Sequence, residues 1–161
     1  NYSNKKMLII SELISTIFYL GKIKYAPGTV GSFFSMILIF LLNYYTEKLF
    51  FIIIFFIILI IAFISISKYS KIINKIDSEE IIIDEFIGIY LIFFFYDFIM
   101  INNEILKLCL IFFLFRFFDI TKIFPANIID KRITNSFGVL LDDIIAAIYT
   151  IISIYILNVF Y

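Results

Sequence analysis

The chain has 161 residues, of which 63% are hydrophobic and only 16% are charged, and its formal net charge is zero. A soluble domain carries about a quarter charged residues, so this composition is typical of a membrane protein, and the zero balance gives no reason to expect a nucleic-acid partner. The lack of histidine and the single cysteine, Cys109, exclude histidine-based catalysis, histidine-bearing zinc sites and a disulfide framework. The length predicts one domain over residues 1–161.

The first 20 residues contain an apolar stretch that follows Lys5 and Lys6 and is interrupted by Glu12. This stretch is too short to cross a bilayer comfortably, and no small-residue cleavage site follows it. We therefore expect an interfacial or buried helix here rather than a signal peptide.

Residues 21–32, GKIKYAPGTVGS, form the first irregular stretch, in which Pro27 and Gly28 indicate a turn. Thr29 or Ser32 could cap the helix that follows. Free backbone N–H groups at that helix start, with two lysines nearby, could also hold a phosphate. A lone glycine-rich turn is a weak motif, so an ordinary capped turn is the simpler interpretation of this stretch taken alone.

Five apolar runs follow, at residues 32–45, 49–66, 86–101, 105–118 and 144–161. Only the second and the fifth are as long as the roughly 18 residues that indicate a spanning helix. Because a backbone in lipid must satisfy its own hydrogen bonds, we expect an all-α fold. The prediction is a helical bundle, a polytopic membrane protein with about five apolar spans plus short interfacial helices.

The lysines and arginines predict an orientation for these spans. With the N-terminus inside, the inner segments carry eleven of them and the outer segments only two, Lys48 and Lys107. Positive residues are concentrated on the cytoplasmic side of membrane proteins. This orientation brings most carboxylates to the cytoplasmic end of the bundle and leaves Asp97 and Glu104 at the other end.

The acidic stretch DSEEIIIDEFIG, residues 77–88, begins with a helix-capping signature ahead of Glu80. Asp77, Glu80 and Asp84 would lie on one helical face, where like charges repel and a counter-ion is expected, either a lysine such as Lys75 or a divalent cation. Asp84 and its neighbour Glu85 stand at the edge of an apolar run. Carboxylates in that position are usually functional, so we favour a functional role for this pair.

Residues 115–143 hold the other charged cluster, and its first members are Arg116 and Asp119, spaced to form an ion pair on one helix face. Lys122 precedes Pro125, which predicts the first turn of a short helix that ends near Asp130.

Gly138 is expected to break the chain before the last helix. Asp142 and Asp143 follow it and are adjacent, so helix geometry predicts that at most one of them points into the bundle. Oxygen ligands without histidine or cysteine suit Mg²⁺ or Mn²⁺. Such an ion, with lysine and arginine, would neutralise a phosphate and polarise it for attack by water.

Four blocks of the chain together resemble the phosphatidylglycerophosphatase A family of bacterial membrane phosphatases. They are PGTVGS at 27–32, IDEFIG at 83–88, FRFFDITKIFP at 115–125 followed by Asp130, and GVLLDDIIA at 138–146. The family usually has a second proline directly after the lysine that matches Lys122, and often a glycine where Ser136 and Ala147 stand. These departures concern loop rigidity and helix packing, because every acidic motif position is retained.

The resemblance implies an all-α enzyme of the bacterial inner membrane that hydrolyses phosphatidylglycerol phosphate with Mg²⁺ on the cytoplasmic side, as a step of phospholipid synthesis. It implies a phospholipid substrate and no nucleic acid, and it does not specify an oligomeric state. The implied catalytic residues are Asp84, Glu85, Asp119, Lys122, Asp142 and Asp143, and all of these except Lys122 are also the implied metal ligands. The implied substrate-binding residues are Pro27, Gly28, Thr29, Gly31, Ser32, Arg116 and Asp130.

One alternative from another class is a membrane cation-coupled transport protein that uses the same carboxylates. Transport would place charged residues near the middle of the bilayer, whereas the predicted arrangement gathers them at one end. A purely structural membrane subunit is a further alternative, in which the carboxylates would tolerate replacement by Asn or Gln.

Overall fold

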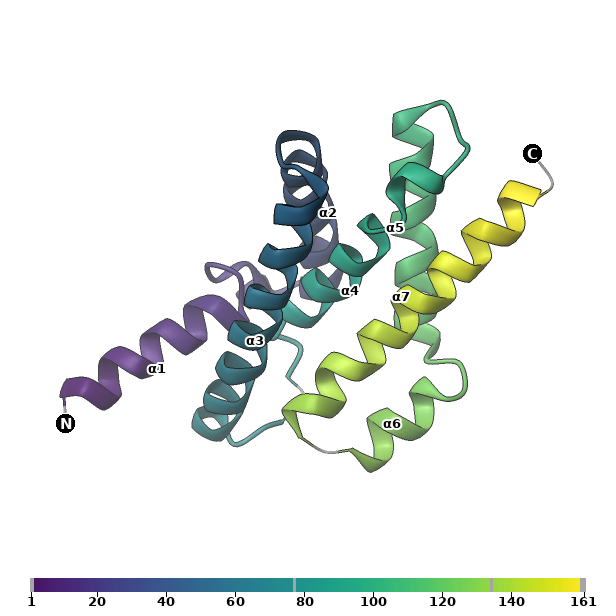
Figure 1. Cartoon of the computed structure of the whole chain (residues 1–161). Coiled ribbons are helices and arrows are strands. Elements are labelled where there is room, and N and C mark those ends of the chain that lie inside the picture. The colour runs from purple at the N-terminus through teal and green to yellow at the C-terminus, as the bar shows by residue number, and fades with distance from the viewer. Residues whose placement is uncertain (1, 77, 134, 160–161) are drawn as a thin grey trace.

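The computed structural model describes residues 2–76, 78–133 and 135–159, and the elements of this part of the chain are all helices (Figure 1). The all-α prediction is confirmed. The elements are α1 (Tyr2–Ser15), η1 (Leu20–Lys22), α2 (Pro27–Tyr45), α3 (Lys48–Ile73), α4 (Ile83–Phe93), η2 (Tyr96–Phe98), α5 (Glu104–Thr121), α6 (Ala126–Arg132) and α7 (Ser136–Val159).

Three helices among the described residues are long and apolar enough to cross a membrane, namely α2, α3 and α7. The prediction of about five spans was therefore wrong. The third apolar run does not form one continuous helix, because α4 has only 11 residues and a short 3-10 helix, η2, follows it. The fourth run forms α5, whose 18 residues include four charged side chains: Glu104, Lys107, Arg116 and Asp119.

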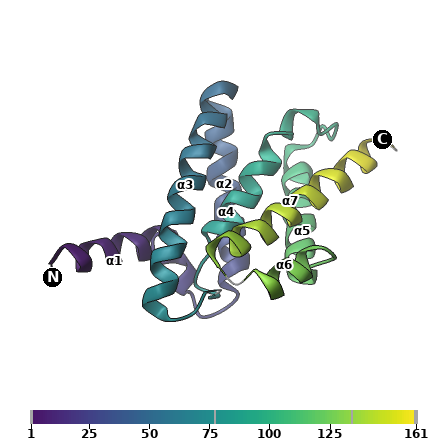
Figure 2. The ribbon, with the colours of Figure 1, turned by 60° about the horizontal axis from the view of Figure 1, so that its bottom comes forward.

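Helix α4 lies in the centre of the molecule and contacts α2, α3 and α7 (Figures 1 and 2). It is apolar on all sides after its first turn, which is typical of a helix surrounded by protein or lipid. Here the surroundings are protein, since nine of its residues are buried. The hydroxyl of Tyr90 donates a hydrogen bond of 3.0 Å to the carbonyl oxygen of Phe51 on α3, and Phe55 and Phe94 pack against the Tyr90 ring.

The outer helices expose large apolar side chains, as expected where lipid rather than water surrounds them. Helix α3 is the clearest case, with exposed Phe56, Ile57, Ile60, Ile61, Phe63 and Ile64. Cys109 on α5 is also exposed. Cys109 is therefore not a packing residue of the protein interior.

Helix α1 extends away from the other helices in both views (Figures 1 and 2). Its C-terminal part packs against α3, where Ser11 and Ser15 are buried. The carbonyl oxygen of Ser15 also accepts a hydrogen bond of 3.0 Å from the backbone N–H of Ile82. Apolar side chains on its middle turns, such as Leu8 and Ile9, are exposed. These features favour the interfacial interpretation of this segment over the buried one, and the interfacial location stays a prediction.

Gly88 lets α4 approach two neighbours closely. A Cβ atom at this position would lie 2.7 Å from the ring of Phe115 on α5 and 3.0 Å from the carbonyl oxygen of Asp143 on α7. Gly88 is four residues after Asp84, so it lies one turn along the same face of α4. The close contact at Gly88 therefore holds the acidic first turn of α4 next to the acidic turn of α7.

Helix α7 begins before Gly138, so the expected break at that residue was wrong. Asn135 caps the helix, because its side-chain oxygen accepts hydrogen bonds from the backbone N–H groups of Phe137 at 2.9 Å and Gly138 at 3.0 Å. A Cβ at Gly138 would lie 1.9 Å from the carbonyl oxygen of Ile133. The glycine is needed for this close approach.

Candidate active site

A cavity of about 360 Å³ opens at the end of the bundle where α2, α4 and α7 begin and α5 ends. Residues from five segments line it, and four of these, including the connection between α3 and α4, contribute charged side chains. The lining residues are Pro27, Gly28, Lys75, Ser78, Glu79, Ile81, Asp84, Glu85, Arg116, Asp119, Lys122, Asp142 and Asp143. All six residues predicted to be catalytic are therefore brought together in one place.

Asp84 and Glu85 belong to the first turn of α4, and both are buried. Together with Asp143 they form a cluster in which one carboxylate oxygen from each residue lies within 4.8 Å of the others. Burial and the adjacent Glu85 raise the pKa of Asp84 well above its usual range, and burial together with Asp143 and Asp119 raises the pKa of Glu85. The cluster therefore needs a compensating positive charge to hold all three carboxylates ionised.

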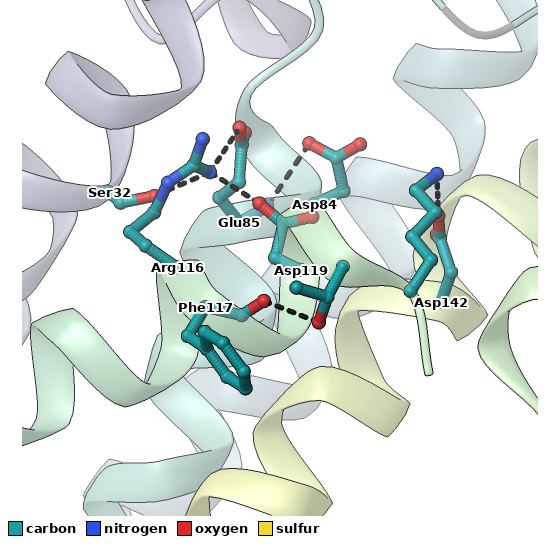
Figure 3. Close-up of polar contacts among 9 residues, drawn as sticks. Ser32, Asp84, Glu85, Arg116, Phe117, Asp119 and Asp142 are labelled. Atoms are coloured by element: carbon teal, nitrogen blue, oxygen red, sulfur yellow. Dashed lines mark hydrogen bonds and ion pairs between the residues drawn. The ribbon is translucent and has the colours of Figure 1, made fainter. Parts of the chain in front are cut away.

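Arg116 on α5 connects three helices around this cluster. Its guanidinium forms ion pairs with Asp119 and, at 3.5 Å, with Glu85 on α4, and it donates a hydrogen bond of 3.4 Å to the Ser32 hydroxyl on α2 (Figure 3). The predicted pair of Arg116 and Asp119 is confirmed. The additional contact with Glu85 depends on α5 and α2 meeting at α4, and spacing along the chain did not indicate it.

Lys122 is the residue that ends α5, and its φ of 42° places it in the left-handed region. Its ammonium group lies 2.7 Å from a carboxylate oxygen of Asp142 on α7. Both Asp142 and Asp143 are buried and line the cavity, so the prediction that at most one of them points inward was wrong. Protein surrounds the start of α7 on more than one side, since α4, α5 and α6 all pack against it.

Gly28 allows the start of α2 to lie against the site. A Cβ at Gly28 would be 2.4 Å from the Oε1 atom of Glu85 and 3.2 Å from the guanidinium nitrogens of Arg116. Pro27 and Gly28 line the cavity as predicted. They are the first two residues of α2, and Ala26 precedes the helix without a side-chain cap. The expectation that Thr29 or Ser32 caps this helix was therefore wrong, because both lie inside it.

The other predicted substrate-binding residues have different positions. Thr29 is exposed and is not among the cavity residues, and Gly31 is buried against the side chain of Ile82 instead. Ser32 reaches the site only through Arg116. The side chain of Asp130 lies outside the described part of the chain.

The expectation that Glu80 shares a helix face with Asp84 was wrong. Residues 78–82 precede α4 and form a turn, in which the backbone N–H of Ile81 donates to the carbonyl oxygen of Ser78 at 2.8 Å. Glu80 is therefore not on a helix face with Asp84. It accepts a hydrogen bond of 2.6 Å from the Tyr69 hydroxyl instead. Asp77 itself lies outside the described residues.

The two lysines of the glycine-rich stretch also lie away from the cavity lining. Lys22 forms an ion pair with Glu12, and Lys24 lies near the ring of Tyr25. Glu79, by contrast, lines the cavity, although it was not among the predicted site residues. Glu79 belongs to the same acidic stretch as Asp84, and this is the sequence feature that could have identified it as a cavity residue.

The charge balance of the cavity tests whether a divalent cation fits. Six carboxylates line it, against three cationic side chains. The Oε2 atom of Glu85 is buried without a hydrogen-bond partner among the described residues, and a buried charged oxygen without a partner is costly. Several carboxylate oxygens around an unpartnered one are the donor set that Mg²⁺ prefers, so the residues fit such an ion.

The fold and the cavity together define an all-helical membrane protein with a carboxylate-rich site that suits a phosphate ester and a divalent cation. The family model for phosphatidylglycerophosphatase A matches residues 13–158. The phosphatidylglycerophosphatase A of Haemophilus influenzae is 31% identical over 153 residues, which cover 94% of this chain and 91% of that protein. The chain belongs to the phosphatidylglycerophosphatase A family, which is named for a phosphoric monoester hydrolase. No solved structure matches the chain.

Proposed function

We propose that this protein is a Mg²⁺-dependent phosphatase that hydrolyses phosphatidylglycerol phosphate to phosphatidylglycerol and inorganic phosphate in phospholipid synthesis. The single observation that carries the proposal is the cavity, in which the buried carboxylates of Asp84, Glu85 and Asp143 stand beside the cations Arg116 and Lys122. Family membership supports the same substrate class.

The carboxylates of Asp84, Glu85 and Asp143 would hold the cation, since their oxygens converge within 4.8 Å. A bound divalent ion would neutralise part of the negative charge of the phosphate and make its phosphorus more open to attack by water. Without such an ion, the excess of carboxylates in the cavity would repel a phosphate group.

The protein side chains orient the phosphate and remove a proton. Arg116 and Lys122 bind the phosphate oxygens, and Asp119 and Asp142 hold these two cations in position through their ion pairs. A carboxylate of the cluster accepts the proton of the attacking water as the bond from phosphorus to the lipid oxygen breaks, and it then gives that proton to the departing lipid oxygen. Burial of the cluster excludes competing bulk water and strengthens each of these electrostatic contacts.

The proposed location is the bacterial inner membrane, with the cavity on the cytoplasmic side. Three crossings by α2, α3 and α7 leave Lys48 and Lys107 at the end opposite the cavity, so the positive-inside rule gives the same orientation that five crossings would give. The alternative of cation-coupled transport is not supported, because the carboxylate cluster lies at one end of the bundle and the family is named for a phosphatase.

The test is phosphate release from phosphatidylglycerol phosphate by the purified protein in detergent, first with Mg²⁺ and then with excess chelator. Asp84→Asn and Asp142→Asn are assayed beside the wild type. We expect release that depends on Mg²⁺ and is lost in both variants. A wild type without activity would contradict the proposed function, and activity that survives chelation and both substitutions would contradict the mechanism.

A further inference from the structure

The three cations that line the cavity have different partners. Within the part of the chain that the structure describes, Arg116 forms ion pairs with Glu85 and Asp119, and Lys122 forms one with Asp142, whereas Lys75 forms none. Lys75 is also the exposed member of the three, so it lies at the mouth of the cavity rather than at its base. A cation without an intramolecular partner at a cavity mouth is available to an anionic ligand.

The backbone at Lys75 is fixed in place by the end of α3. Its N–H donates a hydrogen bond of 3.2 Å to the carbonyl oxygen of Ser70, and the Ser70 hydroxyl donates one of 3.1 Å to the carbonyl oxygen of Ile76. Asn74, in the left-handed region with φ 52°, ends the helix directly before Lys75. The backbone position of Lys75 at the mouth of the cavity is therefore well defined.

The substrate class of the proposed function carries two phosphates. The terminal monoester must reach the buried carboxylates and Arg116, because the bond that breaks is there. The phosphodiester that joins the headgroup to the lipid is one glycerol unit away, and it keeps its negative charge throughout the reaction. A second anionic group at this separation from the reaction centre needs a cation nearer the mouth of the cavity.

We propose that Lys75 binds the phosphodiester of the lipid headgroup and thereby distinguishes a phospholipid phosphomonoester from other phosphomonoesters. This inference rests on the proposed function. It assigns Lys75 to substrate recognition, separately from the groups that act on the terminal phosphate.

The experiment compares Lys75→Met and Lys75→Arg with Lys68→Met, a matched control on α3 whose lysine is exposed and is not among the cavity residues. Two quantities are measured for each protein in detergent with Mg²⁺: the KM for phosphatidylglycerol phosphate and the inhibition constant of inorganic phosphate. Removing a charge-assisted hydrogen bond should raise KM about tenfold in Lys75→Met, with little change in kcat. Lys75→Arg and Lys68→Met should stay near the wild type, and the phosphate inhibition constant should be the same in all four proteins.

Each other result overturns the inference in a recognisable way. An active wild type with an unchanged KM in Lys75→Met would show that the lysine does not bind the substrate. A parallel rise in the inhibition constant of inorganic phosphate would place Lys75 on the terminal phosphate instead. A wild type that releases no phosphate would overturn the proposed function, and this inference with it.

Discussion

The two ends of the helical bundle both carry carboxylates and cations, but in different arrangements. At the end opposite the cavity, Asp97 pairs with Lys48 at 3.1 Å and Glu104 pairs with Lys107 at 3.4 Å. The side chains of Asp97 and Glu104 are 67% and 55% exposed there. At the cavity end the carboxylates outnumber the cations, and Asp143 is only 4% exposed. At the opposite end each carboxylate is largely exposed and paired with one cation, whereas the buried carboxylates of the cavity are in excess, which fits a bound cation.

The largest predicted effect comes from removing one buried charge at the cavity end. Asp143→Asn should lower kcat by at least about 100-fold, because it takes a ligand from the carboxylate cluster. The matched substitution at the other end, Asp97→Asn, should leave kcat unchanged. Phosphate release at saturating substrate measures both, and equal effects at the two ends would contradict the functional difference between them.

A second comparison uses two glycines of α2 that lie three residues apart. Gly28→Ala should lower kcat/KM about tenfold to 100-fold, because its Cβ would displace the Glu85 carboxylate and Arg116. Gly31→Ala would press on the Ile82 side chain instead, so it should lower the free energy of unfolding by about 1–3 kcal/mol with a smaller effect on activity. Thermal unfolding and steady-state kinetics of both variants separate the two outcomes, and a larger loss of activity in Gly31→Ala would be the contrary result.

Mg²⁺ should stabilise the protein through the cavity end only. Burial raises the pKa of Asp84 and Glu85, so their ionised forms are costly until a cation compensates them. At a Mg²⁺ concentration about ten times its Kd, the stabilisation of about 1.4 kcal/mol should raise Tm by about 3–6 °C over the value in chelator. Glu85→Gln should lose this shift, whereas Asp97→Asn should keep it. A shift retained in Glu85→Gln would place the ion elsewhere.

The smallest effect is expected for Lys107→Met, at the end opposite the cavity. Lys107 is buried against the ring of Tyr96, with its ammonium 4.5 Å from the ring centre, and methionine preserves most of that packing. Replacing one partner of a pair whose carboxylate is largely solvated should change the free energy of unfolding by no more than about 1 kcal/mol, with activity unchanged. Denaturant unfolding and the phosphate assay check this. A large loss of activity would show that this end also contributes to catalysis.

The sequence predicted the helical class and most of the cavity residues because these depend on local information. Composition alone requires helices in lipid, and the adjacent acidic motifs on α4 and α7 identify charges that an apolar surrounding would not otherwise contain. The spacing of Arg116 and Asp119 was sufficient to predict their ion pair.

The number of spans could not be predicted in the same way. Runs of Ile and Phe show the same all-round apolar pattern whether the neighbours are lipid, as around Phe56 and Ile60 of α3, or protein, as around Ile87 and Ile89 of α4. Gly88 permits the close packing of the buried helix, but α2 and α7 also contain glycines, and the close approach of Gly88 to α5 and α7 exists only in the assembled fold. The inward position of both Asp142 and Asp143 likewise depends on which helices surround α7.

The carboxylate cluster combines Asp84 and Glu85 of α4 with Asp143 of α7, and α7 follows α2 to α6 along the chain. A ribosome-bound chain that has released α2 to α5 into the membrane still lacks Asp142 and Asp143. Helix α4, with 11 residues and two acidic groups in its first turn, is also too short to be retained in a bilayer by itself. The proposed site is therefore complete only when α7 packs against α4, which makes its assembly a late step in the biosynthesis of the fold.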